Sequence, residues 1–497
     1  MKPQNIILSH LLMQFEVPLD YTNKRSPKTL KLDLIKAKAT RKPFKGSVLF
    51  NPGGPGFSGV EYIVRKGSEY VEILGGHYDI IGFDPRGAGR TLRPSCISFS
   101  KWAGERRDEQ FDERIATWER INSTLWQFIG DLAEDCYRAH ADVGSFYGTP
   151  FVARDMISIV DALGQGDKIN FWGVSYGTIL GQVLASMFPK RIGRMMIDSN
   201  LLADDYLDTA GYRSVQDAKK AFLHFIDECI AAGPDLCSLA SNGVTAESLL
   251  KAINKQLQLD IDPSGTGGSK GIPGGNFTFN VFVLNNLYHA SRFTLLDARI
   301  NGILQGNELA IRVPVKPGFP STWSQVTEVA YRMVFCGDSS FRAETPGDLF
   351  SLYQAHLTAG PFASAMVVTD LSCARWKFQA AEQVNLNSLR NIETANPVLI
   401  INGAYDPITP ASHAWEVSAR LQGSRVVVHE GIGHGFRSHP SECVNDIVAK
   451  YFNEGVLPEI NTTCKPDMPA FEYAKSEAEK EAKEAVGADS GFIKYMG

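Results

Sequence analysis

Residues 169–177, with the sequence INFWGVSYG, decide how this chain folds. The first four residues form a short, mainly apolar run, which predicts a strand buried on both faces. After Gly177, apolar residues recur at helical spacing until Pro189 ends the pattern. Between strand and helix, Ser175 lies in a Gly-x-Ser-x-Gly pattern whose glycines allow a tight turn. This order predicts that the Ser175 hydroxyl is presented as a nucleophile at the N-terminus of a helix.

Short apolar runs of the same kind recur along the chain. They lie at 48–50, 78–83, 195–197, 398–401 and 426–428. Near-continuous runs are typical of parallel strands that helices cover on both faces. A helical pattern at 151–163 lies between two of them, so the chain alternates strand with helix and predicts an α/β fold. In contrast, the leucines at 30, 32 and 34 alternate with polar residues, which predicts a half-buried antiparallel strand.

The alternation stops between about Asn200 and Asn391, where helical patterns and a glycine-rich loop at 262–275 take over. We interpret this stretch as an insertion that forms a lid over the carboxyl edge of the sheet. The Ala/Glu/Lys-rich end of the chain predicts a solvated helix or a frayed tail. The expected organisation is a core at 1–199 and 391–465, a helical lid at 200–390 and a C-terminal tail at 466–497.

Composition excludes several classes of protein. Over 497 residues the hydrophobic share is 44% and the formal charge is −5, so the chain is globular rather than disordered. A pI near 6.1 argues against a nucleic-acid partner. No apolar run approaches the roughly 18 residues that a membrane span needs. Without Cys-x-x-Cys or His-Glu-x-x-His patterns, we expect no metal and no cofactor. The expected partner is a small-molecule or short-peptide substrate, and the oligomeric state stays open.

A second motif, NPGGPG at 51–56, directly follows the predicted strand at 48–50. A glycine-rich loop in this place can aim backbone N–H groups at a developing oxyanion. We predict that Gly54 supplies one donor and that Tyr176, the residue after the nucleophile, supplies the other. Proline has no N–H, so the two prolines of the loop cannot donate. A phosphate-binding loop is disfavoured because no Gly-Lys-Ser/Thr follows.

An aspartate and a histidine complete the candidate site. Asp406 lies in NGAYDP at 402–407, at the end of the predicted strand at 398–401. His434 lies in GIGHG at 431–435, after the strand at 426–428. The chain order Ser175, Asp406, His434 is the order expected of an α/β-hydrolase. We predict that His434 accepts the serine proton and that Asp406 holds the imidazole tautomer.

Other aspartates and histidines fit this site less well. Asp370 is the main rival acid, but no turn before a helix follows it. His413 lies within a predicted helix, and His439 lacks the strand-to-loop context. The turn GFDPRGAGR at 82–90 could bind an anion through Arg86, although we favour a structural turn in which Asp84 and Arg86 pair.

The cysteines and the N-terminus bear on the cellular compartment. Eight cysteines occur, and Cys229 and Cys237 flank a Gly-Pro turn that could bring them together. Three glycosylation sequons begin at Asn122, Asn276 and Asn461. The apolar residues 6–15 faintly resemble a signal peptide, but polar residues interrupt them and no cleavage site follows, so a native or trimmed start is the simpler interpretation. Together these features favour secretion, with a cytoplasmic location as the alternative.

The motifs together resemble the tripeptidyl-aminopeptidase-like branch of serine α/β-hydrolases, which includes prolyl aminopeptidases. The matching segments are EVPLDY (16–21), NPGGPG (51–56), GFDPRGAG (82–89), GVSYG (173–177), NGAYDP (402–407), GHG (433–435) and a closing segment that ends at Cys464. The resemblance runs from about 15 to 466 and is weakest in the lid. It implies a mostly parallel sheet with helices on both faces and an exo-acting peptidase that works on free N-termini.

The resemblance also implies disulfides. Cys443–Cys464 and Cys336–Cys373 fit the family pattern, and Cys96–Cys136 and Cys229–Cys237 follow less directly. This chain departs from the family in one loop, where Phe57 replaces a common glycine. Phe57 is therefore a candidate substrate contact.

Three functions remain open at this point. The first is an exo-type serine aminopeptidase that works through an acyl-enzyme. The second is an esterase, lactonase or biosynthetic hydrolase for a small apolar metabolite. The third is a silent binding protein on a hydrolase scaffold, which the intact Ser175, Asp406 and His434 disfavour.

Overall fold

The computed structural model describes most of the chain. The described residues are 11–96, 117–208, 211, 213–241, 243–258, 275–307, 328–360, 362–363, 366 and 371–492. Within these residues no helix is both long and apolar enough to cross a lipid bilayer.

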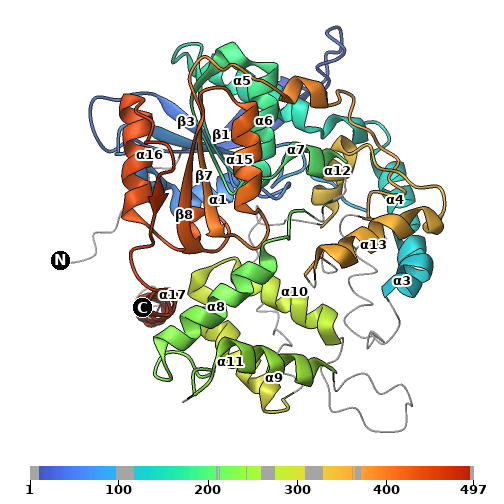
Figure 1. Ribbon diagram of the computed structural model, residues 1–497. Helices are drawn as coiled ribbons and strands as arrows, with labels where there is room; N and C mark the ends of the chain where they lie inside the picture. The colour runs from blue at the N-terminus through green and yellow to red at the C-terminus, as the bar shows by residue number, and fades with distance from the viewer. Residues whose placement is uncertain are drawn as a thin grey trace.

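A nine-stranded sheet forms the centre of the described residues (Figure 1). Its strands are β1 (Leu11–Pro18), β2 (Thr29–Ala37), β3 (Ser47–Asn51), β4 (Asp79–Phe83), β5 (Ile169–Val174), β6 (Ile192–Asp198), β7 (Leu399–Tyr405), β8 (Arg425–Ile432) and β9 (Thr463–Cys464). The spatial order is β1-β2-β4-β3-β5-β6-β7-β8-β9. β1 and β2 pair antiparallel at one edge, and every pair from β4 to β9 is parallel. The predicted α/β fold and the antiparallel strand at the leucines are both confirmed.

Helices cover both faces of the sheet. On one face α1 (Gly59–Ile73) and α16 (Glu442–Glu454) pack on Phe50 and Trp172. On the other face α5 (Thr149–Leu163), α6 (Tyr176–Met187) and α15 (Ala411–Arg420) pack on Leu49 and Phe171. Adjacent residues of a strand point to opposite faces, and both members of each adjacent pair, Leu49 with Phe50 and Phe171 with Trp172, are apolar. This double burial explains why the strands have continuous apolar runs.

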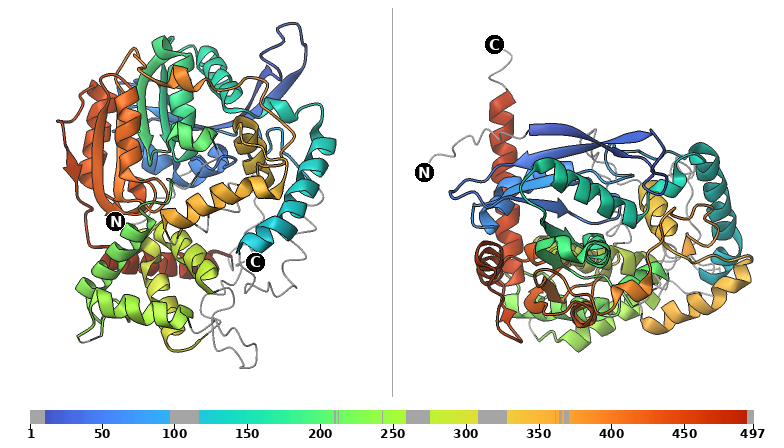
Figure 2. Two further views of the ribbon diagram at one scale, coloured as in Figure 1. Left: turned by 45° about the vertical axis from the view of Figure 1, so that its right-hand side comes forward. Right: turned by 90° about the horizontal axis from the view of Figure 1, so that it is seen from above.

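The inserted region contributes two separate groups of helices (Figure 2). The first cap group is α8 (Ala218–Ala232), α9 (Ala246–Gln258), α10 (Gly275–Leu287) and α11 (Phe293–Leu304), which share one hydrophobic core. The second cap group is α12 (Glu328–Asp338) and α13 (Phe350–Ala359), which lie beside α3 (Thr117–Arg120) and α4 (Trp126–His140). The short helix α7 (Ala203–Leu207) precedes the first group. The prediction of a helix-rich insertion is confirmed, and its division into two groups is new.

The segment expected as a tail contains α17 (Ala470–Phe492). The first turns of this helix are not solvated, because Ala470, Phe471 and Ala474 are fully buried. The ring of Phe471 lies 5.7 Å from that of Phe225 on α8 and 5.5 Å from that of Phe293 on α11. The start of α17 therefore packs into the first cap group, although the Glu/Lys-rich sequence after it suits a solvated helix.

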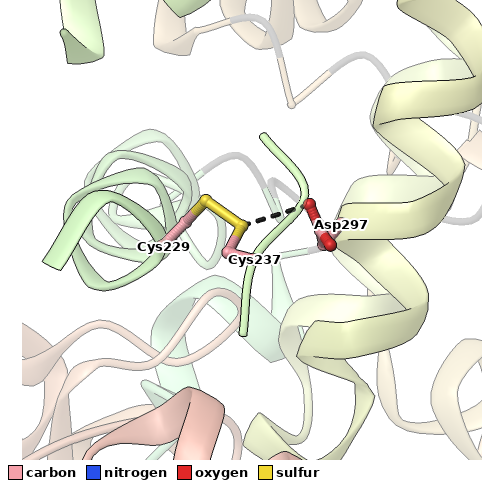
Figure 3. Close-up of side chains that lie close together, drawn as sticks. All are labelled: Cys229, Cys237 and Asp297. Atoms are coloured by element: carbon pink, nitrogen blue, oxygen red, sulfur yellow. Dashed lines mark hydrogen bonds between the residues drawn. A yellow bond between two sulfur atoms is a disulfide. The ribbon is translucent and has the colours of Figure 1, made fainter. Parts of the chain in front are cut away.

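All eight cysteines are paired. The disulfides are Cys96–Cys136, Cys229–Cys237, Cys336–Cys373 and Cys443–Cys464, so the four expected pairings are confirmed. Figure 3 shows the Cys229–Cys237 bridge beside the buried carboxylate of Asp297. That carboxylate accepts the backbone N–H groups of Ser238 and Leu239, at 2.8 and 3.0 Å.

Arg86 joins the antiparallel edge of the sheet to α5. Its Nε lies 2.7 Å and its Nη2 2.9 Å from the two carboxylate oxygens of Asp155, and both side chains are fully buried. Arg86 also donates to the backbone carbonyls of Pro18 and Leu19. The guanidinium thus joins the N-terminal segment to α5, as expected of a structural turn.

The expected pairing of Asp84 with Arg86 is wrong. Asp84 accepts hydrogen bonds from Ser58 Oγ at 2.6 Å and from the Val60 N–H at 3.2 Å. These donors belong to the N-terminus of α1, where unpaired N–H groups and the helix dipole favour a carboxylate. Asp84 therefore binds the N-terminus of α1, and Arg86 pairs with Asp155 of α5 instead.

We expect Arg86→Met to lower the free energy of unfolding by about 3–5 kcal/mol, because it leaves the Asp155 carboxylate buried without its cation. As a control, Arg138→Met removes an ion pair whose arginine is 71% exposed, and it should cost less than about 1 kcal/mol. Urea unfolding followed by tryptophan fluorescence measures both. Equal losses in the two variants would contradict the role given to the buried pair.

Candidate active site

Ser175 lies in the sharp turn between β5 and α6. Its backbone angles are φ 58° and ψ −122°, in a region that L-residues rarely adopt. A Cβ added at Gly173 would lie 2.3 Å from the carbonyl oxygen of Gly177, so a side chain could not fit there. The turn has the strained geometry expected of a nucleophile elbow.

The loop after β3 lies directly against this elbow. A Cβ at Gly53 would lie 2.8 Å from the Cβ of Ser175. The Gly53 N–H is already used, because it donates to Asn51 Oδ1 at 3.0 Å. Tyr176 is the first residue of α6, and first-turn N–H groups have no acceptor within the helix. The N–H groups of Gly54 and Tyr176 therefore remain our candidate oxyanion donors.

Asp406 and His434 are in direct contact. His434 Nδ1 lies 3.0 Å from Asp406 Oδ2 and 3.1 Å from Oδ1. The fully buried carboxylate also accepts hydrogen bonds from Ser199 Oγ (2.7 Å), Thr409 Oγ1 (2.6 Å) and the N–H groups of Ile408 (3.0 Å) and Thr409 (2.9 Å).

These contacts decide the protonation of Asp406. Burial acts to raise the pKa of this carboxyl, but the His434 ring and the hydroxyls of Thr409 and Ser199 outweigh it and lower the pKa below its usual value. Asp406 is therefore ionised at neutral pH and can hold a proton on His434 Nδ1. The other ring nitrogen, Nε2, is then left as a base.

The carboxyl end of β6 links the elbow to the histidine loop. The Ser175 N–H donates to the carbonyl of Asp198 at 3.1 Å. The carboxylate of Asp198 accepts the N–H of Phe436, two residues after His434, at 3.1 Å. Since β5, β6, β7 and β8 are successive neighbours in the sheet, Ser175, Asp406 and His434 follow strand ends at one edge.

Asp198 and Ser199 belong to this site, and the sequence interpretation missed them. Ser199 has φ 58°, donates to Asp406 and accepts the N–H of Gly435 at 2.6 Å. It thereby joins the acid to the loop that carries His434. The signal was present, because Asp198-Ser199-Asn200 follows a buried strand just as the other site residues do.

The rival residues lie elsewhere. His413 is buried in α15, and His439 contacts the carbonyl of Met468 at 2.8 Å. Asp370 lies outside the described residues. The side chain of Phe57 is near the oxyanion loop, because a Cβ at Gly54 would lie 3.3 Å from it, and the residue is 43% exposed.

The first cap group is attached directly to the histidine loop. The His434 N–H donates to the carbonyl of Tyr288 at 2.9 Å, and His289 forms a β-bridge with Gly433. The rings of Tyr288 and His434 meet edge to face, with centroids 5.1 Å apart. This group therefore lies over the carboxyl edge of the sheet.

One cluster in the described residues has the spacing of metal ligands, namely Cys229, Cys237 and Asp297. The two sulfur atoms are bonded to each other, so neither is a thiolate that could bind a metal ion (Figure 3).

Two family models match the chain. The one described as "alpha/beta hydrolase fold" matches residues 46–219, and the one described as "TAP-like protein" matches residues 359–464. The first range contains Ser175 and the second contains Asp406 and His434. Together with the strand order of the sheet, they decide the fold. The chain has the α/β-hydrolase fold.

Relatives of this α/β-hydrolase match nearly its whole length. A tripeptidyl aminopeptidase of Streptomyces lividans is 26% identical over 475 residues, which cover 90% of this chain and 82% of the relative. Serine protease Hip1 of Mycobacterium tuberculosis is 25% identical, with 90% and 86% covered. Carboxylesterase B of Mycobacterium tuberculosis is 26% identical, with 90% and 85% covered. The protein is thus an enzyme, a serine hydrolase.

For this hydrolase we expect Ser175→Ala to lower kcat on an activated aryl ester by about 10³-fold or more, since no other group replaces the nucleophile. Asp406→Asn should lower kcat by about 10⁴-fold, because it leaves the imidazole in the wrong tautomer. The matched control is Ser186→Ala, which should keep full activity. Ser186 lies on the same helix, but its hydroxyl forms a hydrogen bond with Ser388. Near-normal turnover by Ser175→Ala would refute the assignment.

The stability of the hydrolase should depend on pH through Asp198. Burial raises the pKa of this carboxyl to about 7 from its usual 3.8, although the Phe436 N–H and the His434 ring act against the rise. The folded protein then binds the proton more tightly than the unfolded chain, so ionisation of Asp198 lowers the free energy of unfolding as pH rises between these two values.

Asp198→Asn cannot ionise, and the amide oxygen can still accept the Phe436 N–H. We therefore expect its free energy of unfolding, relative to wild type, to be higher at about pH 8 than at about pH 5. Asp348→Asn is the control, because hydrogen bonds from Thr345 lower the pKa of that carboxyl, so it stays ionised and the effect of its loss is constant over this range. A pH-independent difference for Asp198→Asn, measured by urea unfolding, would contradict the expectation.

Proposed function

We propose that this serine hydrolase is an exo-acting aminopeptidase that releases short peptides or residues from free N-termini. The observation that carries the proposal is the match to tripeptidyl aminopeptidase over 90% of the chain, since a match of that length includes both core and cap. The range of the TAP-like model, which contains Asp406 and His434, supports the same conclusion.

In the proposed mechanism Ser175, His434 and Asp406 act as a triad. His434 Nε2 takes the hydroxyl proton while Ser175 Oγ attacks the acyl carbon, and the N–H groups of Gly54 and Tyr176 hold the oxyanion. His434⁺ then protonates the leaving amine and an acyl-enzyme remains. A water molecule, activated by the same imidazole, hydrolyses it. Asp406 stays ionised throughout and stabilises the imidazolium.

The cap supports exo-action by its position. The first cap group is bonded to the histidine loop through Tyr288 and His289. His224 of α8 also stacks on Tyr405, the residue before Asp406, with ring centroids 3.7 Å apart. Helices fixed this close to the strand ends leave room for a chain terminus more readily than for the middle of a folded polypeptide.

We also propose that the enzyme works in the secretory pathway or outside the cell. Four disulfides among the described residues are typical of proteins that fold in an oxidising compartment. A cytoplasmic location is the alternative. Non-reducing peptide mapping of protein purified from its natural source distinguishes the two.

A second candidate is an esterase or lactonase for a small apolar metabolite. It is favoured by the match to Carboxylesterase B, which is as extensive as the peptidase matches. Phe57, with 43% of its surface exposed beside the oxyanion loop, would offer an apolar contact to such a substrate.

A paired substrate panel tests the proposal. It contains tripeptidyl and aminoacyl p-nitroanilides with free N-termini, the same compounds N-acetylated, and p-nitrophenyl esters, each with Ser175→Ala as the blank. We expect cleavage of free amides with kcat/KM at least about tenfold higher than for acetylated ones, because a charge-assisted contact to the ammonium is lost on acetylation. Turnover of esters without any amide would instead establish the second candidate. Equal cleavage of free and acetylated peptides would refute exo-action.

A further inference from the structure

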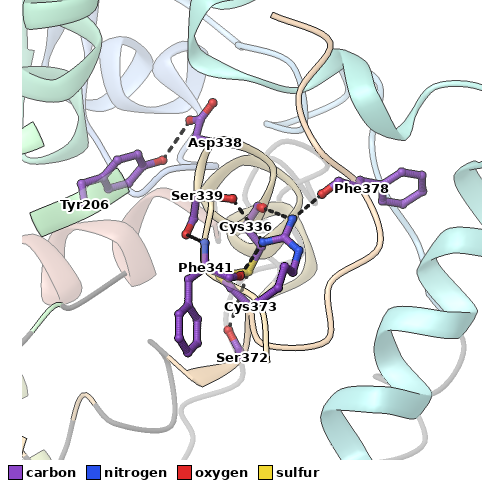
Figure 4. Close-up of a disulfide and its surroundings, with 9 residues drawn as sticks. Tyr206, Cys336, Asp338, Ser339, Phe341, Ser372, Cys373 and Phe378 are labelled. Carbon is purple, nitrogen blue, oxygen red and sulfur yellow. Dashed lines mark hydrogen bonds between the residues drawn. A yellow bond between two sulfur atoms is a disulfide. The ribbon is translucent and has the colours of Figure 1, made fainter. Parts of the chain in front are cut away.

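A buried acid of the second cap group contacts the core next to the elbow. Asp338, the last residue of α12, is 4% exposed. Its carboxylate accepts the Thr149 N–H at 2.9 Å, the Thr149 hydroxyl at 2.6 Å and the Tyr206 hydroxyl at 3.2 Å. Figure 4 shows the hydrogen bond between the Tyr206 hydroxyl and Asp338.

The hydrogen bonds continue from Asp338 to Tyr176. The Thr149 and Tyr176 hydroxyls lie 2.6 Å apart. An ionised carboxylate only accepts, so Thr149 must donate its proton to Asp338. The threonine oxygen is then left to accept from the Tyr176 hydroxyl. Both hydrogen bonds therefore have a fixed direction, from Tyr176 to Thr149 and from Thr149 to Asp338. They hold the hydroxyl end of the Tyr176 side chain, which is 1% exposed.

The charge on Asp338 supports this direction. Burial raises the pKa of Asp338 to about 6, while the hydrogen bonds from Thr149 and Tyr206 act to lower it. The carboxyl is therefore mostly ionised at neutral pH and more fully ionised above it. A buried carboxylate without its donors would be costly, which makes the contacts to Thr149 firm.

The same helix supports the other side of the candidate oxyanion hole. A Cβ added at Gly56 would lie 3.1 Å from the Cβ of Ala330 on α12, so the loop 51–56 and this helix are in close contact. α12 therefore touches the loop that contains Gly54, and it reaches Tyr176 through Thr149.

The C-terminal end of α12 is itself firmly held. The Cys336–Cys373 disulfide bonds it to the segment after α13 (Figure 4). Arg342 donates to the carbonyls of Cys336, Ser339 and Phe378, at 3.0, 3.1 and 2.7 Å. Asp338 lies within this fixed turn, so its position does not depend on the described helices of the first cap group.

We propose that Asp338 is a positioning residue of the oxyanion hole, acting through the Thr149 hydroxyl on Tyr176. Part of the inserted region is then a fixed support of the catalytic centre rather than a lid. The inference rests on the proposed function, because it takes the Tyr176 N–H as an oxyanion donor. Loss of the link should let the elbow turn shift and weaken the hydrogen bond to the oxyanion, while the ground-state substrate binds as before.

The test uses Thr149→Val, which has nearly the same shape but no hydroxyl, and Thr149→Ser, which restores the hydroxyl. Asp338→Asn is the third variant. Asp297→Asn is the matched control, since Asp297 is also a buried cap carboxylate that accepts backbone N–H groups but lies in the first cap group. For each protein we would measure kcat, KM, the thermal midpoint and the inhibition constant of an arylboronic acid, whose tetrahedral adduct with serine places an oxygen in the oxyanion hole.

We expect Thr149→Val and Asp338→Asn to lower kcat and boronate affinity together by about tenfold, with KM within about twofold of wild type. Thr149→Ser should recover both, and Asp297→Asn should change neither. Wild-type kcat and boronate affinity in Thr149→Val would overturn the proposal, as would a fall in kcat without a fall in boronate affinity, or no recovery in Thr149→Ser. If Asp338→Asn does not fold, the threonine pair decides. Failure of the proposed function is seen separately, as no hydrolysis and no fluorophosphonate labelling of Ser175 in the wild type.

Discussion

The catalytic edge of this protein depends on the cost of burying one carboxylate. Asp406 has no exposure to water, so the donors it would have found in solvent must come from the protein. They come from three successive strand ends: Ser199 after β6, Ile408 and Thr409 after β7, and His434 after β8. The donors to this single charge therefore join the loop that carries His434 to the end of β7 and, through Asp198 and Ser199, to the turn that carries Ser175.

Much of this arrangement could be predicted from the sequence, because strands buried on both faces leave continuous apolar runs. Once those runs locate the strands, Ser175, Asp406 and His434 all fall just beyond a carboxyl end. Neighbouring parallel strands then place them at one edge without any knowledge of the side-chain contacts. The glycine-rich loop after β3 is located by the same rule.

The remaining features depend on partners that are distant in the chain and chosen by packing. Asp84 and Arg86 are close in sequence and opposite in charge, yet Asp84 is used by the start of α1 and Arg86 finds Asp155, 69 residues away. The buried turns of α17 look solvated in the sequence because the fully buried Ala470, Phe471 and Ala474 are few and the Glu/Lys-rich remainder dominates the composition. The inserted region divides into two cap groups because of the way the apolar faces of its helices pair. The periodicity within one helix does not specify that pairing.

The contact between Tyr288 and His434 joins main-chain atoms of both residues. A bond of this kind does not depend on which side chain stands at either position, provided that the backbone keeps its path. The cap can therefore exchange side chains other than that of Tyr288, whose ring contacts the imidazole, without losing its attachment to the histidine loop.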